Sequence, residues 1–227
     1  MEEINKNNLP KHIAITMDGN GRWAKSKGKL RIFGHNNGVK AVRDTVEAAA
    51  EIGIEFLTLY AFSTENWNRP SKEVNALMTL LVSAINKETK TLMDNNIKLS
   101  AIGDTDSLPS KAKKELAEAI DKTKENTRMT LVLALSYSGR WDILNAVNEI
   151  TKKGVGNDKI TEEQFQQYLS TKSVPDPELL IRTSGEYRIS NFLLWQIAYS
   201  ELYFTDTLWP DFRRADLAKA ILDYQSR

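Results

Sequence analysis

Residues 12–24 read HIAITMDGNGRWA, and this stretch decides the fold that we expect of the 227-residue chain. Its first six residues are mostly apolar or β-branched and predict a strand. The turn DGNG follows at the carboxyl end of that strand, and its two glycines allow backbone N–H groups to converge on an anion. Asp18 is placed to hold a hard cation that phosphates also coordinate. The alternative is a simple strand-to-helix turn that Asp18 caps.

Outward from this stretch, β-rich runs alternate with segments of helical period. Five more strands are predicted at residues 56–63, 98–102, 129–136, 179–183 and 200–204. Helices are predicted at residues 37–52, 73–94, 111–125, 141–153 and 215–224, and a capping box of Thr161 and Gln164 begins another. This alternation predicts one α/β domain over residues 1–227, with a mostly parallel six-stranded sheet flanked by helices.

The composition excludes several classes of protein. With 31 basic and 30 acidic side chains the net charge is +1, so nothing in the overall balance indicates a nucleic-acid partner. Cysteine is absent and only two histidines are present, which excludes disulfides, thiolate metal sites and a zinc site built from histidine. The first residues, MEEINKNNLPKH, are polar, and no apolar run is long enough to span a membrane. We therefore expect an unexported, cytoplasmic protein.

Three other segments carry groups that bind anions. Arg31 and His35 lie in a glycine-punctuated segment, residues 28–38, which leads into the first long helix. STENWNRP at residues 63–70 follows the second strand, and RTSGEYRISN at residues 182–191 follows the fifth. Taken alone, each segment is equally consistent with an anion-binding segment and with a connecting loop on the surface. Because parallel strands bind ligands at their carboxyl ends, all three are expected at the same edge of the sheet as DGNG, and arginine forks there match diphosphate oxygens.

Apolar side chains beneath that edge leave two interpretations open. One stripe of the helix at residues 73–94 packs on the sheet, or it also forms an apolar wall for a ligand; its members are Val74, Leu77, Met78, Leu81, Ile85 and Leu92. In the second strand, alternation puts Leu59, Ala61 and Ser63 on one face. Ala61, one step below the edge, is either ordinary packing or leaves room for such a ligand.

A dinucleotide site is the first alternative, since Gly19, Gly21 and Ala24 have the spacing of its glycine fingerprint. That fold requires an unbroken helix next and an acidic residue about 20 positions further on. Gly28 and Gly34 interrupt the following segment, and the acidic residue after the second strand is Glu65. The spacing therefore disfavours a nicotinamide-dependent enzyme.

Several long segments, in this order, resemble the undecaprenyl diphosphate synthase family of cis-prenyltransferases. They are DGNGRWA at residues 18–24, the run from Arg31 through GH at 34–35 to Gly38, LTLYAFSTENWNRP at 57–70, GRWD at 139–142, RTSGEYRISNFLLWQIAYSELYF at 182–204 and LWPDF at 208–212. The resemblance spans essentially the whole chain. It implies a homodimeric enzyme with an apolar tunnel beneath the catalytic edge, which adds isopentenyl diphosphate to an allylic diphosphate, usually farnesyl diphosphate.

The resemblance also implies roles for individual residues. Asp18 would hold Mg²⁺ on a diphosphate, with Glu201 as a further metal-associated carboxylate. The allylic diphosphate would be bound by Gly19, Asn20, Gly21, Arg22, Arg31 and His35, with Trp23 beside its chain. Ser63, Thr64, Glu65, Trp67 and Arg69 match a substrate-contacting loop, and Asn66 matches a proposed proton acceptor. Arg182, Arg188, Ile189 and Ser190 would bind isopentenyl diphosphate.

Three points stay open at this stage. A neutral amide is a poor base, so Asn66 is also interpreted as orienting a group or a water while a diphosphate oxygen takes the proton. A non-catalytic partner subunit would keep the fold without turnover, but would not need the aspartate, the glycine turn and the arginines together. We also expect a peripheral contact with the inner face of the plasma membrane for product release, while the product length and the preferred primer are not determined.

Overall fold

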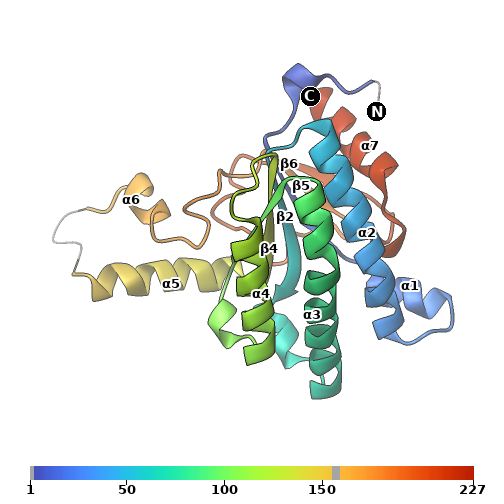
Figure 1. The fold of residues 1–227 in the computed structure, drawn as a ribbon. Helices are drawn as coiled ribbons and strands as arrows, with labels where there is room; N and C mark the ends of the chain where they lie inside the picture. The colour runs from blue at the N-terminus through green and yellow to red at the C-terminus, as the bar shows by residue number, and fades with distance from the viewer. Residues whose placement is uncertain (1–2, 155–158) are drawn as a thin grey trace.

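Six strands form one sheet in the computed structural model, which describes residues 3–154 and 159–227 (Figure 1). The strands are β1 (His12–Thr16), β2 (Phe56–Ser63), β3 (Ile97–Ile102), β4 (Met129–Tyr137), β5 (Leu179–Arg182) and β6 (Glu201–Phe204). Their order is β3-β4-β2-β1-β5-β6, and every neighbouring pair is parallel. The predicted strands and the parallel sheet are confirmed, because buried runs of β-branched and leucine residues signal such strands strongly.

Seven α-helices connect and cover the strands within the described residues. They are α1 (Asn20–Ser26), α2 (Arg31–Ile52), α3 (Ser71–Asp94), α4 (Ser110–Thr123), α5 (Gly139–Lys152), α6 (Glu162–Gln166) and α7 (Arg214–Gln225). The capping box of Thr161 and Gln164 is present at the start of α6, although this helix has only five residues. In Figure 1, α5 and α6 extend to the left, away from the rest of the molecule.

The two faces of the sheet are covered differently. Helices α2, α3, α4 and α7 lie over one face, where their apolar side chains pack on Ile13, Ile15, Leu57 and Leu59 (Figure 1). The irregular segment between β5 and β6 covers part of the other face. Its Phe192 and Leu193 are buried against residues that include Ala14, Val132 and Leu180. The main core therefore lies between the sheet and the helices, directly beneath the carboxyl ends of the strands.

Helix α2 begins earlier than its sequence predicts. The segment 28–38 was expected to be broken by glycines, yet the helix runs from Arg31 through Gly34. A Cβ atom at Gly34 would lie 2.0 Å from the backbone oxygen of Asn20, so only glycine lets α1 and α2 approach this closely. Packing thus outweighs the cost of a glycine within a helix, about 1 kcal/mol. As a result, Arg31 and His35 belong to the first turns of α2, beside the DGNG turn.

Strand β2 departs from simple alternation near its carboxyl end. Its register with β4 shifts between Tyr60 and Phe62 and again between Phe62 and Ser63. Ala61 and Phe62 consequently both contact the main core, whereas alternation predicts this for Ala61 alone. The irregularity brings the end of β2 to the place where the polar segment 63–70 begins.

Candidate active site

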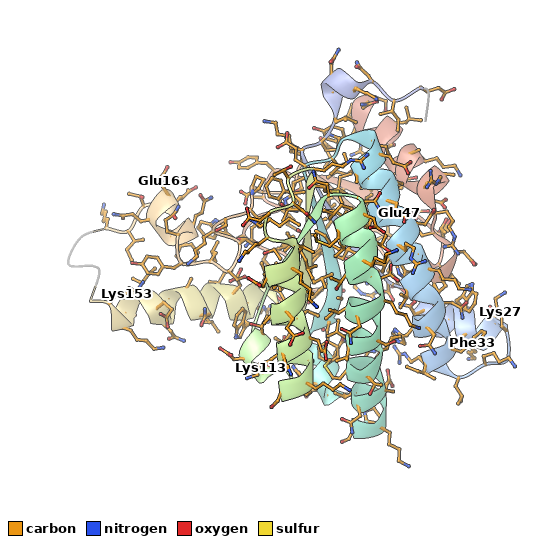
Figure 2. The ribbon with its side chains drawn as sticks, viewed as in Figure 1. Lys27, Phe33, Glu47, Lys113, Lys153 and Glu163 are labelled. Atoms are coloured by element: carbon orange, nitrogen blue, oxygen red, sulfur yellow. The ribbon has the colours of Figure 1, made fainter. Side chains whose placement is uncertain are left out.

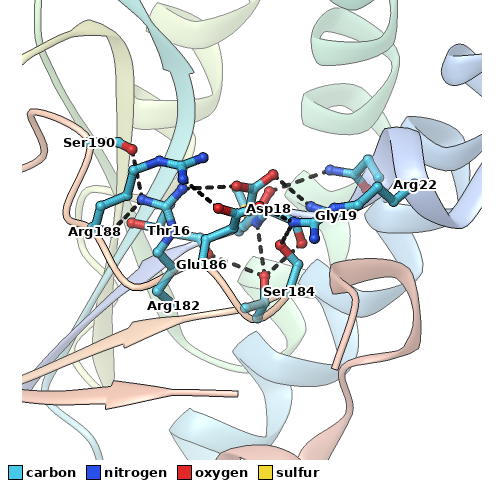
Figure 3. Close-up of polar contacts among 12 residues, drawn as sticks. Thr16, Asp18, Gly19, Arg22, Arg182, Ser184, Glu186, Arg188 and Ser190 are labelled. Atoms are coloured by element: carbon cyan, nitrogen blue, oxygen red, sulfur yellow. Dashed lines mark hydrogen bonds and ion pairs between the residues drawn. The ribbon is translucent and has the colours of Figure 1, made fainter. Parts of the chain in front are cut away.

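Asp18 lies at the carboxyl end of β1, where two other segments hold it (Figure 3). Its backbone N–H donates to Thr183 Oγ1 at 2.9 Å, and its Oδ2 accepts from Arg182 Nη2 at 2.9 Å. Oδ1 accepts from the Gly19 N–H at 2.8 Å. The carboxylate is still 38% exposed, so it can reach a ligand at this edge.

The predicted glycine turn is the N-terminus of helix α1. Gly19 is its N-cap and has φ +107°, a left-handed conformation that glycine adopts readily, while a Cβ there would also lie 2.9 Å from Ser184 Cβ. The first N–H groups of a helix lack partners within it and favour anions. The converging N–H groups expected from the sequence therefore come from a short helix, next to Asp18.

Arg182 is a buried organiser of the edge. Its side chain is 3% exposed. Besides Asp18, its Nη1 donates to Ser190 Oγ at 2.7 Å and to the Arg188 backbone oxygen at 2.5 Å. Its Nε is buried and has no hydrogen-bond partner among the described residues. Arg182 thus connects β5, the Asp18 carboxylate and the loop that carries Arg188.

Arg22 and Arg188 share one carboxylate across the edge. Arg22 Nη2 lies 2.9 Å from Glu186 Oε1 and donates to Ser184 Oγ at 2.5 Å, while Arg188 pairs with Glu186 Oε2 (Figure 3). The side chains of the two arginines are 51% and 60% exposed. Glu186 therefore holds both guanidinium groups near Asp18 in positions that an incoming diphosphate can contact.

The segment after β2 forms a short 3₁₀ helix, Thr64–Asn68. Asn66 Oδ1 accepts from the Ser63 N–H at 3.2 Å, as the side-chain part of a capping box. This bond uses one of the two lone pairs of the carbonyl oxygen and turns the NH₂ group of Asn66 away from the Ser63 N–H, so that it can donate to a ligand. This geometry favours the orienting role over proton acceptance.

Glu65 joins this segment to the arginine loop. Its Oε1 accepts from Asn191 Nδ2 at 2.8 Å, and Asn191 also accepts from the N–H groups of Gly139 and Arg140 at the start of α5. Burial raises the pKa of Glu65, but the hydrogen bonds from Asn191, Ser63 and Thr64 outweigh it and hold the pKa below its usual value. Glu65 is therefore a carboxylate at neutral pH, fixed between the two loops.

A cluster of cationic residues surrounds His35. Glu73 Oε1 lies 3.0 Å from Arg69 Nη1 and 3.5 Å from Arg31 Nε. Burial, followed by the charges of Arg69 and Arg31, lowers the pKa of His35 to about 4, so that its ring is neutral at pH 7. In the part of the chain that the structure describes, the buried atoms His35 Nε2 and Asn20 Oδ1 have no hydrogen-bond partner. Two arginines for one carboxylate leave positive charge at the mouth of the cavity described next.

A cavity of about 240 Å³ extends from this edge into the space between the sheet and helices α2 and α3. Asn20, His35, Asn66 and Arg69 line its polar part. Its apolar lining comes from α2, α3, β2, β3 and β4, and includes Val42, Leu59, Ala61, Leu77, Met78, Leu81, Ile85, Leu92, Leu99, Leu131 and Leu133. The stripe of α3 therefore packs in the core, and its residues from Leu77 to Leu92 also line the cavity, while a tunnel for a growing chain stays a prediction.

Of the predicted site residues, Asn20, His35, Asn66 and Arg69 line the cavity, and four of the others have contacts away from both the cavity and the Asp18 contacts. Trp67 is anchored instead, with its Nε1 donating to Ser136 Oγ at 2.9 Å and its ring against Phe62. Trp23 packs on Phe33, with ring centroids 5.7 Å apart, and Ile189 packs against the other face of the sheet. Glu201 begins β6, so it lies at the amino edge, opposite Asp18, and its Oε2 pairs with Arg227. Within one chain the two predicted metal-associated carboxylates are not brought together.

Sequence reasoning missed the residues that hold these side chains in place. They are Glu73, Thr183, Glu186 and Asn191, and each contacts a predicted site residue through a bond described above. Three of them, Thr183, Glu186 and Asn191, lie inside the quoted arginine-rich motif, which was the available signal. No local pattern shows which arginine an acidic side chain pairs with.

An exposed aspartate, converging arginines and a helix N-terminus above an apolar cavity define an α/β enzyme for apolar substrates that carry phosphate. Comparison with known proteins agrees. The family model of undecaprenyl diphosphate synthases, a prenyltransferase family, matches residues 16–227. The chain therefore belongs to this family, which confirms the predicted family and enzyme class and leaves the dinucleotide alternative without support.

Individual relatives are similar over nearly their whole length. The (2E,6E)-farnesyl-diphosphate-specific ditrans,polycis-undecaprenyl-diphosphate synthase of Pasteurella multocida is 54% identical over 100% of this chain and 96% of its own. An isoprenyl transferase of Chlorobaculum tepidum is 56% identical over 96% of this chain and 84% of its own. The crystal structure of lavandulyl diphosphate synthase from Lavandula x intermedia, in complex with dimethylallyl diphosphate, superposes with a TM-score of 0.93 at 38% identity, covering 96% of both chains.

Proposed function

We propose that this chain adds isopentenyl diphosphate units sequentially to farnesyl diphosphate and releases a long-chain cis-polyprenyl diphosphate, undecaprenyl diphosphate. One observation carries the proposal: a single cavity has a cationic, hydrogen-bonding mouth at the strand edge and an apolar interior. A diphosphate with an isoprenoid chain has the same division into a charged head and an apolar tail. The relatives named above as farnesyl-diphosphate-specific synthases support this choice of primer.

The edge offers two places for a diphosphate. The allylic diphosphate binds at the N-terminus of α1 and the first turns of α2, where Arg31, His35 and Arg69 surround the cavity mouth and the tail can enter the cavity. Isopentenyl diphosphate binds on the other side of Asp18, at Arg188 and Ser190, within the loop that Arg182 fixes. The exposed side chain of Arg188 supports its role as a contact for isopentenyl diphosphate, and the buried side chain of Arg182 supports its role in fixing the loop.

The reaction needs positioning and charge stabilisation rather than a protein nucleophile. The C–O bond of the allylic diphosphate breaks, and the terminal carbon of isopentenyl diphosphate bonds to the freed allylic carbon. That product loses a proton to give the cis double bond, and a diphosphate oxygen takes the proton. Negative charge develops on the leaving oxygens, where helix N–H groups and arginines stabilise it. Asn66 orients the reacting groups through its NH₂.

The donor set at Asp18 fits a magnesium ion that substrate completes. Mg²⁺ is typically held by one or two carboxylates together with phosphate oxygens and waters. Asp18 supplies one exposed carboxylate, and the described residues contain no group of three acidic or histidine side chains that could enclose a metal. When bound there, Mg²⁺ would neutralise charge on the diphosphate. Asp18 would then be a protein ligand of the ion, with substrate and water completing its coordination.

The remaining expectations concern assembly and location. We propose a homodimer, which is also the arrangement in which Glu201, remote from Asp18 in one chain, could approach a second active site. Among the described residues, no helix is both long and apolar enough to cross a bilayer. We keep the prediction of a cytoplasmic enzyme that contacts the inner face of the plasma membrane only peripherally.

The decisive experiment follows radiolabelled isopentenyl diphosphate into product, with farnesyl diphosphate as primer and Mg²⁺ present. Reversed-phase chromatography of the product should show long cis-polyprenyl chains, and chelation of the metal should stop incorporation. A protein that binds both substrates but incorporates no label would be the non-catalytic partner subunit considered above. Incorporation that stops after the first condensation would show that the cavity does not serve elongation.

A further inference from the structure

The α1–α2 corner, residues 23–33, exposes apolar side chains at the outer end of the molecule. Figure 2 shows Lys27 and Phe33 at this end, to the right of the body of the protein. Leu30, which precedes the first residue of α2, is 81% exposed, and Phe33 is 38% exposed. Exposed leucine and phenylalanine side by side on a convex corner are costly to keep in water unless another surface covers them.

The same corner is strongly basic, although the whole chain is nearly neutral. Residues 19–43 contain seven lysines and arginines and no aspartate or glutamate. The three arginines of this run each pair with an acidic residue elsewhere: Arg22 with Glu186, Arg31 with Glu73 and Arg43 with Glu88. Within the described residues, the lysines of the corner form no such ion pair.

Three lysines of the corner are exposed and point their charge to solvent. Lys25, Lys27 and Lys29 are all exposed, and none forms an ion pair with any residue in the described part of the chain. Lys27 Nζ lies 4.7 Å from the centre of the Trp23 ring, at the base of the corner. Positive charge therefore surrounds the two exposed apolar side chains.

The combination selects an anionic lipid surface. Apolar side chains that enter the headgroup region, ringed by lysines that face lipid phosphates, are the features of interfacial binding. The corner also adjoins the active site, since α2 continues within one turn from Phe33 to His35, which lines the cavity.

We propose that the α1–α2 corner docks on an anionic lipid bilayer, with Leu30 and Phe33 in the headgroup region and Lys25, Lys27 and Lys29 on lipid phosphates. The proposal rests on the proposed function in one respect: a product with a long apolar tail must leave the cavity for a membrane. Docking at this corner holds the cavity mouth close to the lipid that receives the product.

Sedimentation with vesicles tests the proposal. The full-length protein is mixed with phosphatidylcholine vesicles or with vesicles that also contain phosphatidylglycerol. We expect binding only to the anionic vesicles, weakened by salt. The variant Lys25→Gln/Lys29→Gln should bind anionic vesicles about tenfold or more weakly. Each lysine near an anionic surface adds a similar electrostatic gain in affinity, and this variant removes two of them. Leu30→Ser should weaken binding severalfold and leave its salt dependence unchanged.

A matched control removes the same charge elsewhere. Lys111 and Lys122 are exposed on α4, remote from the corner in Figure 1, and Lys111→Gln/Lys122→Gln should bind vesicles like the wild type. Equal binding to both kinds of vesicle, or equal losses in the control and the corner variants, would overturn the proposal. So would a change of molecular mass in light scattering for Leu30→Ser, which would assign the corner to contacts between chains.

The two proposals fail in different ways. In a detergent assay without vesicles, the corner variants should keep the wild-type kcat and the wild-type KM for farnesyl diphosphate. A raised KM would show that the lysines serve the substrate and would overturn the docking proposal alone. A wild-type protein that binds anionic vesicles but incorporates no isopentenyl diphosphate would refute the proposed function while the docking surface stood.

Discussion

Replacing Asp18 separates its structural contact from its proposed role in catalysis. Asp18 Oδ2 accepts from the buried Arg182 at 2.9 Å. In Asp18→Asn an amide oxygen can keep this hydrogen bond, so the loss is the difference between a charged and a neutral acceptor, about 1 kcal/mol. In Asp18→Ala the acceptor is gone, and the cost rises to roughly 2–3 kcal/mol, reduced by the partial exposure of the carboxylate and by the other acceptors of Arg182.

The rate should respond very differently from stability. Both variants lose the carboxylate that would hold Mg²⁺ on the diphosphate, and the loss of several kcal/mol of charge stabilisation lowers kcat by about 10²–10⁴. For a chain of this size each 1 kcal/mol corresponds to about 2–4 °C in Tm. Asp18→Asn should therefore melt within a few degrees of the wild type while being nearly inactive, and it should still bind farnesyl diphosphate.

The assay is incorporation of radiolabelled isopentenyl diphosphate at saturating Mg²⁺, with thermal unfolding measured on the same preparations. Asp44→Asn is the matched control, because Asp44 also accepts from an arginine, Arg214, but lies outside the cavity lining and the Asp18 contacts. It should lose stability without losing rate. If Asp18→Asn keeps more than about a tenth of the wild-type kcat, the role assigned to Asp18 is wrong.

Three further predictions follow from the same geometry. Arg188→Ala should lower kcat/KM for isopentenyl diphosphate about tenfold or more and leave the affinity for farnesyl diphosphate unchanged, since it removes one charge-assisted contact; equal losses in titrations of both substrates would contradict two separate diphosphate sites. Ala61→Leu should narrow the cavity and shorten the products while the first condensation survives, as judged by reversed-phase chromatography; a stably folded variant with the wild-type product distribution would show that the chain does not pass Ala61. Burial lowers the pKa of both His12 and His35 to about 4, below the unfolded value near 6.5, so the folded state binds fewer protons, and stability should be full above pH 6.5 and fall as the pH drops towards 4. Urea unfolding across this range should show the fall, His12→Asn should reduce its slope, and an unchanged slope in that variant would refute the assignment.

The sequence by itself determined which segments are strands and that they form a mostly parallel sheet, because local patterns identify each strand and the helices between them. Residues 12–17 form a strand that ends at the turn DGNG, and the arginine-rich segment 182–191 begins at the end of another strand. Parallel strands bring these carboxyl ends to one edge of the sheet. The apolar stripe of α3 was equally readable, since a period of 3.6 residues is a property of the helix alone. Long matching motifs then identified the family.

Tertiary structure alone decided what each polar group contacts. The predicted binding of substrate by Arg182 stays a prediction, and only the tertiary structure shows that its buried guanidinium also contacts Asp18, Ser190 and the backbone of its own loop. The carbonyl oxygen of Asn66 accepts a hydrogen bond in a capping box, which no propensity indicates.

Packing also set the start of α2. Gly34 signals a helix break in sequence, yet close approach to α1 makes it a helical contact. The physical reason is the same in each case. Periodicity and turn chemistry depend on neighbours in the chain. The residue that pairs with a charged group, or that packs against a glycine, lies far away in sequence and is brought there by the fold.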